Sequence, residues 1–163
     1  MKITITSPLL GLTMLILVAV KSITLQRNCT GYLKRAADAN TVQLAIEQMT
    51  YSLKYLQAKG MTKGYTSVFW NTPDEDVGYW YNNLLTSYKE LLNVSPNASQ
   101  LEKSNVLMKL RETLIDNGEN GDNLTVPDGL SRYPNNLMWG TILMLGIILT
   151  FITPFIFYET YYK

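Results

Sequence analysis

The sequence predicts an all-α fold in which two transmembrane helices, one near each end of the chain, flank a three-helix bundle. Three observations indicate this fold: an uncharged apolar run at 137–158, a shorter apolar run near the N-terminus, and helical spacing of apolar residues between them in the 163-residue chain. We therefore divide the chain into an N-terminal transmembrane anchor at 1–25, a helical bundle domain at 26–117, a return loop at 118–136, a C-terminal transmembrane helix at 137–158 and a short tail at 159–163.

The N-terminal anchor is the weaker of the two predicted spans, because its apolar stretch from Leu9 to Val20 is short. Lys2 before the stretch and Ser22 after it also suit a cleaved secretory signal peptide. A retained helix from Pro8 to Leu25 spans the bilayer if Lys21 extends its ammonium group to the lipid headgroups. We favour the retained anchor and place Lys21 at the membrane interface.

The C-terminal run carries no charge from Leu137 to Tyr158, and ~20 such residues cross a bilayer as a helix. Aromatic residues with a polar edge favour the two lipid–water interfaces. Such residues stand at both ends of the run and are predicted interface residues: Tyr133, Trp139, Tyr158, Tyr161 and Tyr162. Small residues lie along one side of each span and permit close helix contact. They are Ser7, Gly11, Ala19 and Ser22 in the first span and Gly146, Thr150 and Thr153 in the second.

The bundle is expected to open with one long helix that continues the first span. Apolar residues recur at steps of three and four and form a single helical stripe. The stripe comprises Tyr32, Ala36, Ala39, Val42, Ile46, Met49, Leu53 and Leu56. No Gly or Pro lies between Tyr32 and Lys59, so Gly31 is the one weak point before the stripe. Gly60 and Gly64 are expected to end the helix.

Two further helices complete the predicted bundle, after an extended crossing at 65–70. In "TPDE", Thr72 is the predicted N-cap, Pro73 suits the first helical position, and Glu75 completes a capping box. The third helix begins at Ser95–Pro96 or a few residues later. It stops at Asn117–Gly118, where Gly accepts the left-handed conformation that ends many helices.

Composition excludes several classes of function. The segment 26–136 holds 11 Lys/Arg and 12 Asp/Glu, and such a neutral segment is a poor nucleic-acid binder. The chain has no histidine and one cysteine, Cys29, which excludes His-containing catalytic triads, usual zinc sites and an intramolecular disulfide. "DNGENGDN" from Asp116 to Asn123 resembles a calcium loop only faintly, because Gly118 and Pro127 stand where ligands are needed. We expect no cofactor, no metal and no enzymatic activity.

An aromatic set is the most informative feature of the bundle, and we predict that part of it contacts a partner. Trp and Tyr dominate interface hot spots, although large side chains also fill small cores. Tyr79, Trp80 and Tyr81 are consecutive and cannot all face one core stripe, so Tyr79 or Tyr81 is expected to point outward. The predicted contact residues are Phe69, Trp70, Tyr79, Trp80 and Tyr81.

Two sequence signals disagree about the side of the membrane on which the bundle lies. Lys and Arg gather next to the bundle, which favours a cytoplasmic bundle by the positive-inside rule. The short basic start before an apolar run resembles a signal anchor, and four glycosylation sequons, at Asn28, Asn93, Asn97 and Asn123, suit an exterior surface. We favour an extracytoplasmic bundle, with both short termini cytoplasmic.

These features predict a non-enzymatic two-span membrane protein, an accessory subunit or scaffold of a larger membrane assembly. Its expected partners are membrane lipids and either other membrane protein subunits or further copies of itself. The layout of span, helical bundle and span also resembles the extracytoplasmic sensor portion of chemoreceptors and histidine kinases, without a shared motif. The alternative is therefore a sensor or ligand-binding module, with Asn40, Gln48 and Asn105 as polar candidates for its pocket.

Overall fold

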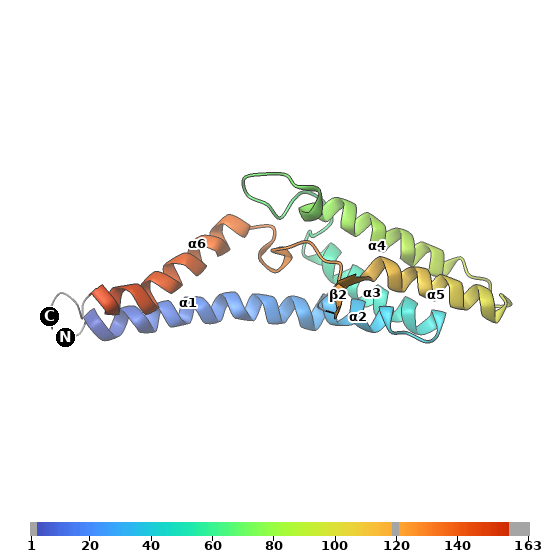
Figure 1. Cartoon of the computed structure of the whole chain (residues 1–163), viewed down its shortest axis with the longest axis horizontal. Coiled ribbons are helices and arrows are strands. Elements are labelled where there is room, and N and C mark those ends of the chain that lie inside the picture. The colour runs from blue at the N-terminus through green and yellow to red at the C-terminus, as the bar shows by residue number, and fades with distance from the viewer. Residues whose placement is uncertain (1–2, 119–120, 157–163) are drawn as a thin grey trace. The chain divides into compact units, whose positions relative to one another are not determined.

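The computed structural model describes residues 3–118 and 121–156, and it is mostly helical with one small β-hairpin (Figure 1). The chain forms two compact units. Unit 1 comprises 1–24 and 131–163, and unit 2 comprises 25–130. The predicted interface residues Tyr158, Tyr161 and Tyr162 and the tail at 159–163 lie outside the described residues.

Unit 1 contains two long apolar helices. α1 spans Ile3–Leu25, and α6 spans Asn136–Ile147 before a π-helical turn, η4, at Ile148–Ile152. Continuous helix extends over Ser7–Ala37 and Asn136–Ile156, and only 11% and 6% of their most apolar windows are buried. By length and composition, both helices are able to cross a membrane. The predicted pair of long apolar helices, one near each end of the chain, is confirmed.

The helical backbone runs from α1 into unit 2 through a π-helical turn, η1, at Gln26–Thr30. This turn lies directly before Gly31, the weak point expected from the sequence. A Cβ atom at Gly31 would lie 2.7 Å from the Gln26 carbonyl oxygen, so the local winding requires glycine. The next helix, α2, covers only Gly31–Ala37.

The single long helix predicted from Tyr32 to Leu56 is wrong, because the chain reverses at 38–41. α3 begins there and spans Val42–Ala58, packed on α2. The Thr41 hydroxyl caps α3 by accepting a bond of 3.2 Å from the Leu44 amide. Short polar side chains such as those of Asp38, Asn40 and Thr41 bind nearby backbone and favour turns and caps over helix interiors. The spacing of the apolar residues did not reveal the reversal, because their steps of three and four residues continue without a break from α2 into α3.

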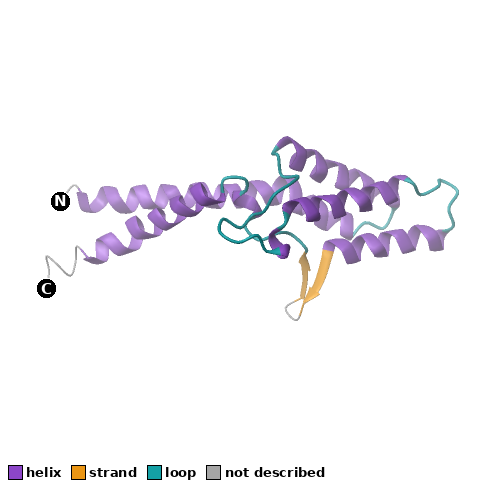
Figure 2. Cartoon of the chain, turned by 90° about the horizontal axis from the view of Figure 1, so that it is seen from above, coloured by secondary structure: helices purple, strands orange, loops and turns teal. Residues whose placement is uncertain are grey.

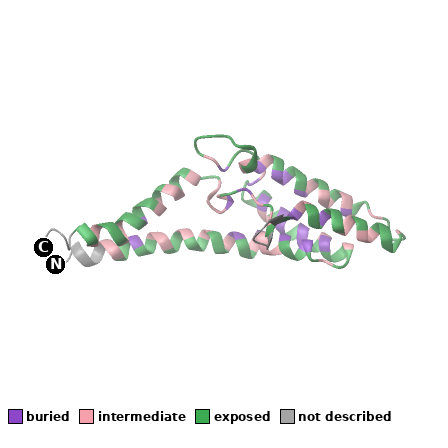
Figure 3. Ribbon diagram, in the orientation of Figure 1, coloured by how far each residue is buried: buried purple, intermediate pink, exposed green. Residues whose placement is uncertain are grey.

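The core of unit 2 lies among α2, α3, α4 (Val77–Leu92) and α5 (Gln100–Leu114), so four helices replace the predicted three. Buried positions of α3 recur at helical spacing and face the other helices (Figure 3). They are Ala45, Gln48, Met49, Ser52, Leu53 and Leu56. Val77, Leu84 and Leu91 of α4 are fully buried and contribute the opposing face.

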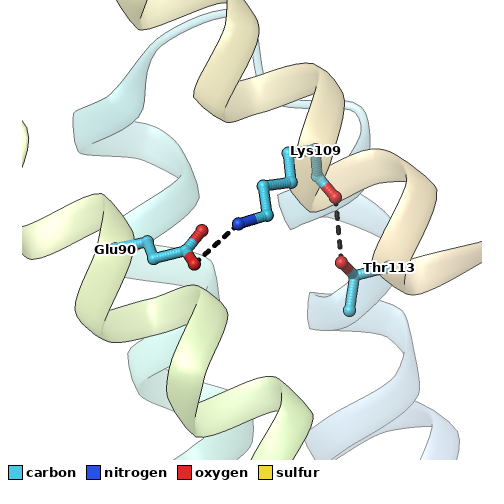
Figure 4. A network of polar contacts seen from close by, with 3 residues as sticks. All are labelled: Glu90, Lys109 and Thr113. Atoms are coloured by element: carbon cyan, nitrogen blue, oxygen red, sulfur yellow. Dashed lines mark hydrogen bonds and ion pairs between the residues drawn. The ribbon is translucent and has the colours of Figure 1, made fainter.

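Two surface ion pairs tie α5 to its neighbours. Lys109 Nζ lies 2.7 Å from Glu90 Oε1 of α4, and the Thr113 hydroxyl donates to the Lys109 carbonyl oxygen one turn away (Figure 4). Arg111 reaches Asp38 at 2.7 Å and so links α5 to the reversal after α2. Exposed pairs of this kind contribute ~0–1 kcal/mol each. Packing of the apolar core, rather than charge, therefore holds the bundle.

The predicted capping box at Thr72 is also wrong. Pro73–Glu75 form a short 3₁₀ turn, η2, and the Thr72 side chain makes no cap bond. Asp76 instead caps α4, accepting from the Tyr79 amide at 2.9 Å. The cause is tertiary: backbone bonds from Thr66 N to Glu75 O (2.9 Å) and from Val77 N to Gly64 O (2.8 Å) hold 75–77 away from helical geometry. Asp76 directly before the first buried position of α4 was the available sequence signal.

The stretch predicted as helix stop and return loop contains an antiparallel hairpin, so the fold is not purely α. β1 spans Ile115–Gly118 and β2 spans Gly121–Leu124, coloured orange in Figure 2. In this register Asp116 lies opposite Asn123, so both ends of the faint calcium-loop sequence belong to a strand pair. α5 accordingly ends at Leu114, and a 3₁₀ turn, η3, at Leu130–Arg132 leads toward α6.

Candidate functional site

Within unit 1, α1 and α6 run antiparallel and cross closely at small residues. The Ser7 and Thr153 hydroxyl oxygens lie 2.9 Å apart. A Cβ atom added to Gly11 would lie 2.7 Å from the Thr150 amide nitrogen and 2.8 Å from the Gly146 carbonyl oxygen. The two backbones therefore touch, as small residues permit in lipid. Five of the residues predicted for this role meet here, whereas Ala19 and Ser22 are exposed.

Two of the predicted interface residues contact each other at the other end of the pair. The Lys21 ammonium nitrogen lies 5.0 Å from the centre of the Trp139 ring, a cation–π geometry. Tyr133, half-buried, precedes α6 by a few residues. Lys21, Tyr133 and Trp139 thus lie around one end of the apolar pair, where a membrane interface would favour them.

The outward sides of both helices are covered by exposed large apolar side chains. On α1 these are Leu9, Leu10, Leu12, Ile16, Leu17, Val20 and Ile23. On α6 and the turns after it they are Leu137, Met138, Met144, Leu145, Ile147, Ile148, Phe151, Ile152, Phe155 and Ile156. A contiguous apolar surface of this extent marks a membrane or protein contact rather than a water-facing surface.

The aromatic residues predicted to contact a partner separate into two groups. Trp80 and Tyr81 are buried: Trp80 Nε1 donates to the Thr125 carbonyl oxygen at 2.6 Å, and the Tyr81 hydroxyl accepts from Gln57 Nε2 at 2.8 Å. Both belong to the core of unit 2 and are not available to a partner. Phe69, Trp70 and Tyr79 are 77%, 74% and 67% exposed, so the outward position required of Tyr79 or Tyr81 is taken by Tyr79.

The polar residues considered for a pocket are only partly brought together. Asn40 and Gln48 line a shallow cavity of about 310 Å³ with Arg35 and Asp38, whereas Asn105 is an exposed residue elsewhere on α5. Gln48 is 5% exposed, and its Oε1 atom has no hydrogen-bond partner. A buried acceptor without a partner costs ~1–3 kcal/mol, so this side chain is an unusual member of the core.

A second cavity, of about 380 Å³, lies between the start of α4 and the segment after β2. Four carboxylates line it, from Asp74, Asp76, Asp116 and Asp128. Asp76 is already used as the cap of α4. Across residues 3–118 and 121–156, no three acidic or cysteine side chains are grouped closely enough to hold a metal ion. This cavity therefore has acidic walls without a metal-binding cluster.

Cys29 lies beyond the apolar stretch of α1 and is fully buried in unit 2. The Ser52 hydroxyl donates to the Cys29 carbonyl oxygen at 3.0 Å. Burial raises the pKa of the Cys29 thiol from 9.0 to about 12, which outweighs the lowering effect of the Ser52 side chain on the thiol. The thiolate is the reactive form of cysteine, so this thiol is unreactive at neutral pH.

Comparison with known proteins yields no match, whether to a protein-family model, to a curated protein or to a solved structure.

Proposed function

We propose that the chain is a non-enzymatic membrane protein with two spans, which serves as an accessory subunit or scaffold of a larger membrane protein assembly. The observation that carries the proposal is the α1–α6 pair. Its contact is made by Ser7, Gly11 and Thr150 and their neighbours, and its remaining surface is apolar and exposed. This is the arrangement expected of two helices whose solvent is lipid.

Water is an implausible solvent for that surface. Burying one Leu, Ile or Phe side chain is worth ~1.5–3 kcal/mol, and more than a dozen such side chains on α1, on α6 and on the helical turns after α6 are exposed. A bilayer supplies this burial over the full length of both helices, and helical backbone needs no further hydrogen-bond partners there. At the crossing the Ser7 hydroxyl donates to the Thr153 hydroxyl, which in turn donates to the Leu149 carbonyl oxygen within its own helix.

Two antiparallel spans put the segments before α1 and after α6 on one side of the membrane and unit 2 on the other. We assign unit 2 to the extracytoplasmic side, on the signal-anchor pattern at the start of the chain and the four sequons. Unit 2 is then tethered to the two spans through Leu25 at one end of its sequence and Leu130 at the other.

An accessory or scaffold role is supported by the surface of unit 2. Tyr79 is exposed on α4, and Leu101 and Met108 are exposed on one face of α5, seven positions apart. Exposed aromatic and apolar anchors of this kind are typical of protein contacts. Helices of partner proteins would also pack against the apolar sides of α1 and α6 within the bilayer.

To test the proposal, the full-length chain is extracted from its native membrane in nanodiscs, and the mass of the resulting particle is measured. A stoichiometric set of other membrane subunits, or a defined assembly of this chain alone, is the expected result. Met108→Glu should reduce the recovered assembly, whereas Thr86→Glu, which adds the same charge at an exposed site on α4, should not. A solitary monomer would refute the proposal.

A second candidate function, a ligand-binding module, is favoured by one observation. Gln48 lines a cavity together with Arg35 and Asn40, and its buried amide oxygen has no hydrogen-bond partner. A small polar ligand that reached this oxygen would satisfy it. Gln48→Met, of similar shape, should raise the free energy of unfolding by ~1 kcal/mol and abolish any small molecule that native mass spectrometry finds on the wild-type chain. Absence of any bound molecule on the wild-type chain would refute this alternative.

A further inference from the structure

We propose that the loop between α3 and α4 inserts its aromatic tip, Phe69 and Trp70, into the lipid headgroup region of the membrane that anchors the chain. The inference rests on the proposed two-span function and names the contact that unit 2 makes with the bilayer. Three features support it: the composition of the tip, the closed base of the loop, and its place in unit 2.

The tip of the loop is apolar, aromatic and uncharged. No charged residue occurs at 65–73, and the exposed side chains in this stretch include Val68, Phe69 and Trp70. The Phe69 and Trp70 ring centres lie 5.9 Å apart at an angle of 57°, so the two rings form one surface patch. Trp is the residue that most favours the lipid–water interface, and Phe and Val favour the adjoining hydrocarbon.

The base of the loop is closed by backbone hydrogen bonds. Tyr65 pairs with Asp76 as an antiparallel bridge, and the Val77 amide donates to the Gly64 carbonyl oxygen at 2.8 Å. Within the tip, the Trp70 amide donates to the Ser67 hydroxyl at 3.1 Å. A tip fixed at its base loses less conformational freedom on insertion than a free loop would.

The loop leaves unit 2 at the end where the chain also enters and leaves that unit. Ser52 of α3 lies level with Cys29, because its hydroxyl donates to the Cys29 carbonyl oxygen. α3 continues past that point to Ala58, back toward the entry at Leu25, and the loop follows. At the far end of the loop, Trp80 donates to the Thr125 carbonyl oxygen, five residues before the exit at Leu130.

On the two-span proposal, both tethers of unit 2 lead to membrane-spanning helices, which makes this end of the unit the one that the chain itself keeps near the bilayer. Figure 1 shows the loop, in green, projecting beyond the ends of α3 and α4. Tethering makes insertion an intramolecular step, which raises the effective concentration of bilayer around the loop. A soluble domain would leave two large rings in water at the same position, where exposed aromatic patches favour association.

The three tryptophans of the chain provide the test and its controls. Full-length variants that retain one tryptophan each, made with Trp→Phe at the other two positions, are reconstituted in phosphatidylcholine bilayers. Each is compared in ordinary lipid and in lipid brominated on its acyl chains close to the headgroup, which quenches tryptophan on contact. Trp139 reports the proposed span, Trp80 is the buried control, and Trp70 reports the loop.

The expected result is a loss of Trp70 emission comparable with that of Trp139, while Trp80 emission is unchanged. Quenching of Trp139 without Trp70 would overturn the loop insertion and leave the two spans standing. Quenching of neither would refute the two-span proposal together with the inference. Trp70 that is shielded from aqueous acrylamide but not quenched by the lipid would identify a second copy of the chain as the occupant, and would overturn the lipid assignment.

A second comparison avoids any change at Trp80, whose hydrogen bond to Thr125 supports the fold. The difference in quenching between the wild-type chain and Trp70→Phe isolates the contribution of Trp70 alone. Fractional quenching that is greater in the wild-type chain than in Trp70→Phe is the expected result. Fractional quenching that is smaller in the wild-type chain would place Trp70 in water and overturn the inference, even if the single-tryptophan variants fold poorly.

Discussion

Gly11→Ala should separate α1 from α6, because the new methyl group has no space. The added Cβ would lie 2.7 Å from the Thr150 amide nitrogen and 2.8 Å from the Gly146 carbonyl oxygen, whereas ordinary contact begins at 3.4 Å. The Thr150 hydroxyl also meets the added methyl group and is able to rotate, but these two neighbours are backbone atoms and cannot. The helices must move apart by at least 0.6–0.7 Å, which also lengthens the contact between Ser7 and Thr153.

Overpacking of this kind costs ~1–3 kcal/mol, which corresponds to a ~5- to 150-fold loss in the equilibrium for helix pairing. The assay is disulfide trapping in bilayers, with Ser7→Cys and Thr153→Cys introduced together. Their hydroxyl oxygens are 2.9 Å apart, so thiols at the same positions need only a small adjustment to reach the S–S distance of ~2.05 Å. Cys29 is buried and does not compete.

Gly140→Ala is the matched control, because a Cβ at that position meets nothing within 4 Å. We expect Gly11→Ala to reduce the trapped fraction strongly and Gly140→Ala to leave it unchanged. Equal trapping in the two variants would refute the close crossing of the two helices.

Three further predictions concern unit 2. Cys29 should resist maleimide at neutral pH in the folded chain. Because burial raises the pKa of the Cys29 thiol, the contribution of this thiol to stability is complete below pH 9.0 and is lost as the pH rises toward about 12. If the free energy of unfolding of Cys29→Ala falls with pH as steeply as that of the wild-type chain over this range, the assignment is contradicted. Asp76→Ala should lower the free energy of unfolding by ~0.5–2 kcal/mol through loss of the α4 cap, whereas Thr72→Val should change it by less than ~0.5 kcal/mol, as measured by urea denaturation; equal effects would contradict the cap. Trp80→Phe should cost ~0.5–1.5 kcal/mol by removing the hydrogen bond to the Thr125 carbonyl oxygen, and the exposed Trp70→Phe should have no effect on the same curve; a neutral Trp80→Phe would show that this bond does not support the fold.

Features encoded by local composition were predictable from the sequence. The uncharged run after Leu137 predicted the second long helix, and the small residues Gly11 and Gly146 indicated that each long helix permits a close helix contact. The three consecutive aromatic residues required one outward side chain, and Tyr79 provides it. Each of these inferences depends on the nature of neighbouring residues and on helical geometry alone.

Features set by contacts distant in the sequence were not predictable. The reversal at 38–41 leaves the apolar phase of Tyr32 to Leu56 intact, so a continuous helix and a hairpin fit the same spacing. The late start of α4 depends on the pairing of Gly64 with Val77 across the loop. Trp80 and Tyr81 are buried because Thr125 and Gln57 lie opposite them, and neither partner is marked in the local sequence.

The residues of the candidate sites also divide into those predictable from the local sequence and those set by distant contacts. Lys21 and Trp139 could be placed at an interface from their position beside apolar runs, and they contact each other within unit 1. The unpaired amide of Gln48 is visible only once α3 has folded against α2, because burial and the absence of a partner are properties of the assembled core.

The most direct test of the two-span architecture is a protease-protection measurement on sealed native membrane vesicles, with a different epitope tag at each end of the full-length chain. Two spans predict that alkaline carbonate leaves the chain in the membrane pellet. They also predict that both tags are digested from the same side, while a fragment containing unit 2 is protected. Release of the chain by carbonate, or digestion of the two tags from opposite sides, would contradict the architecture.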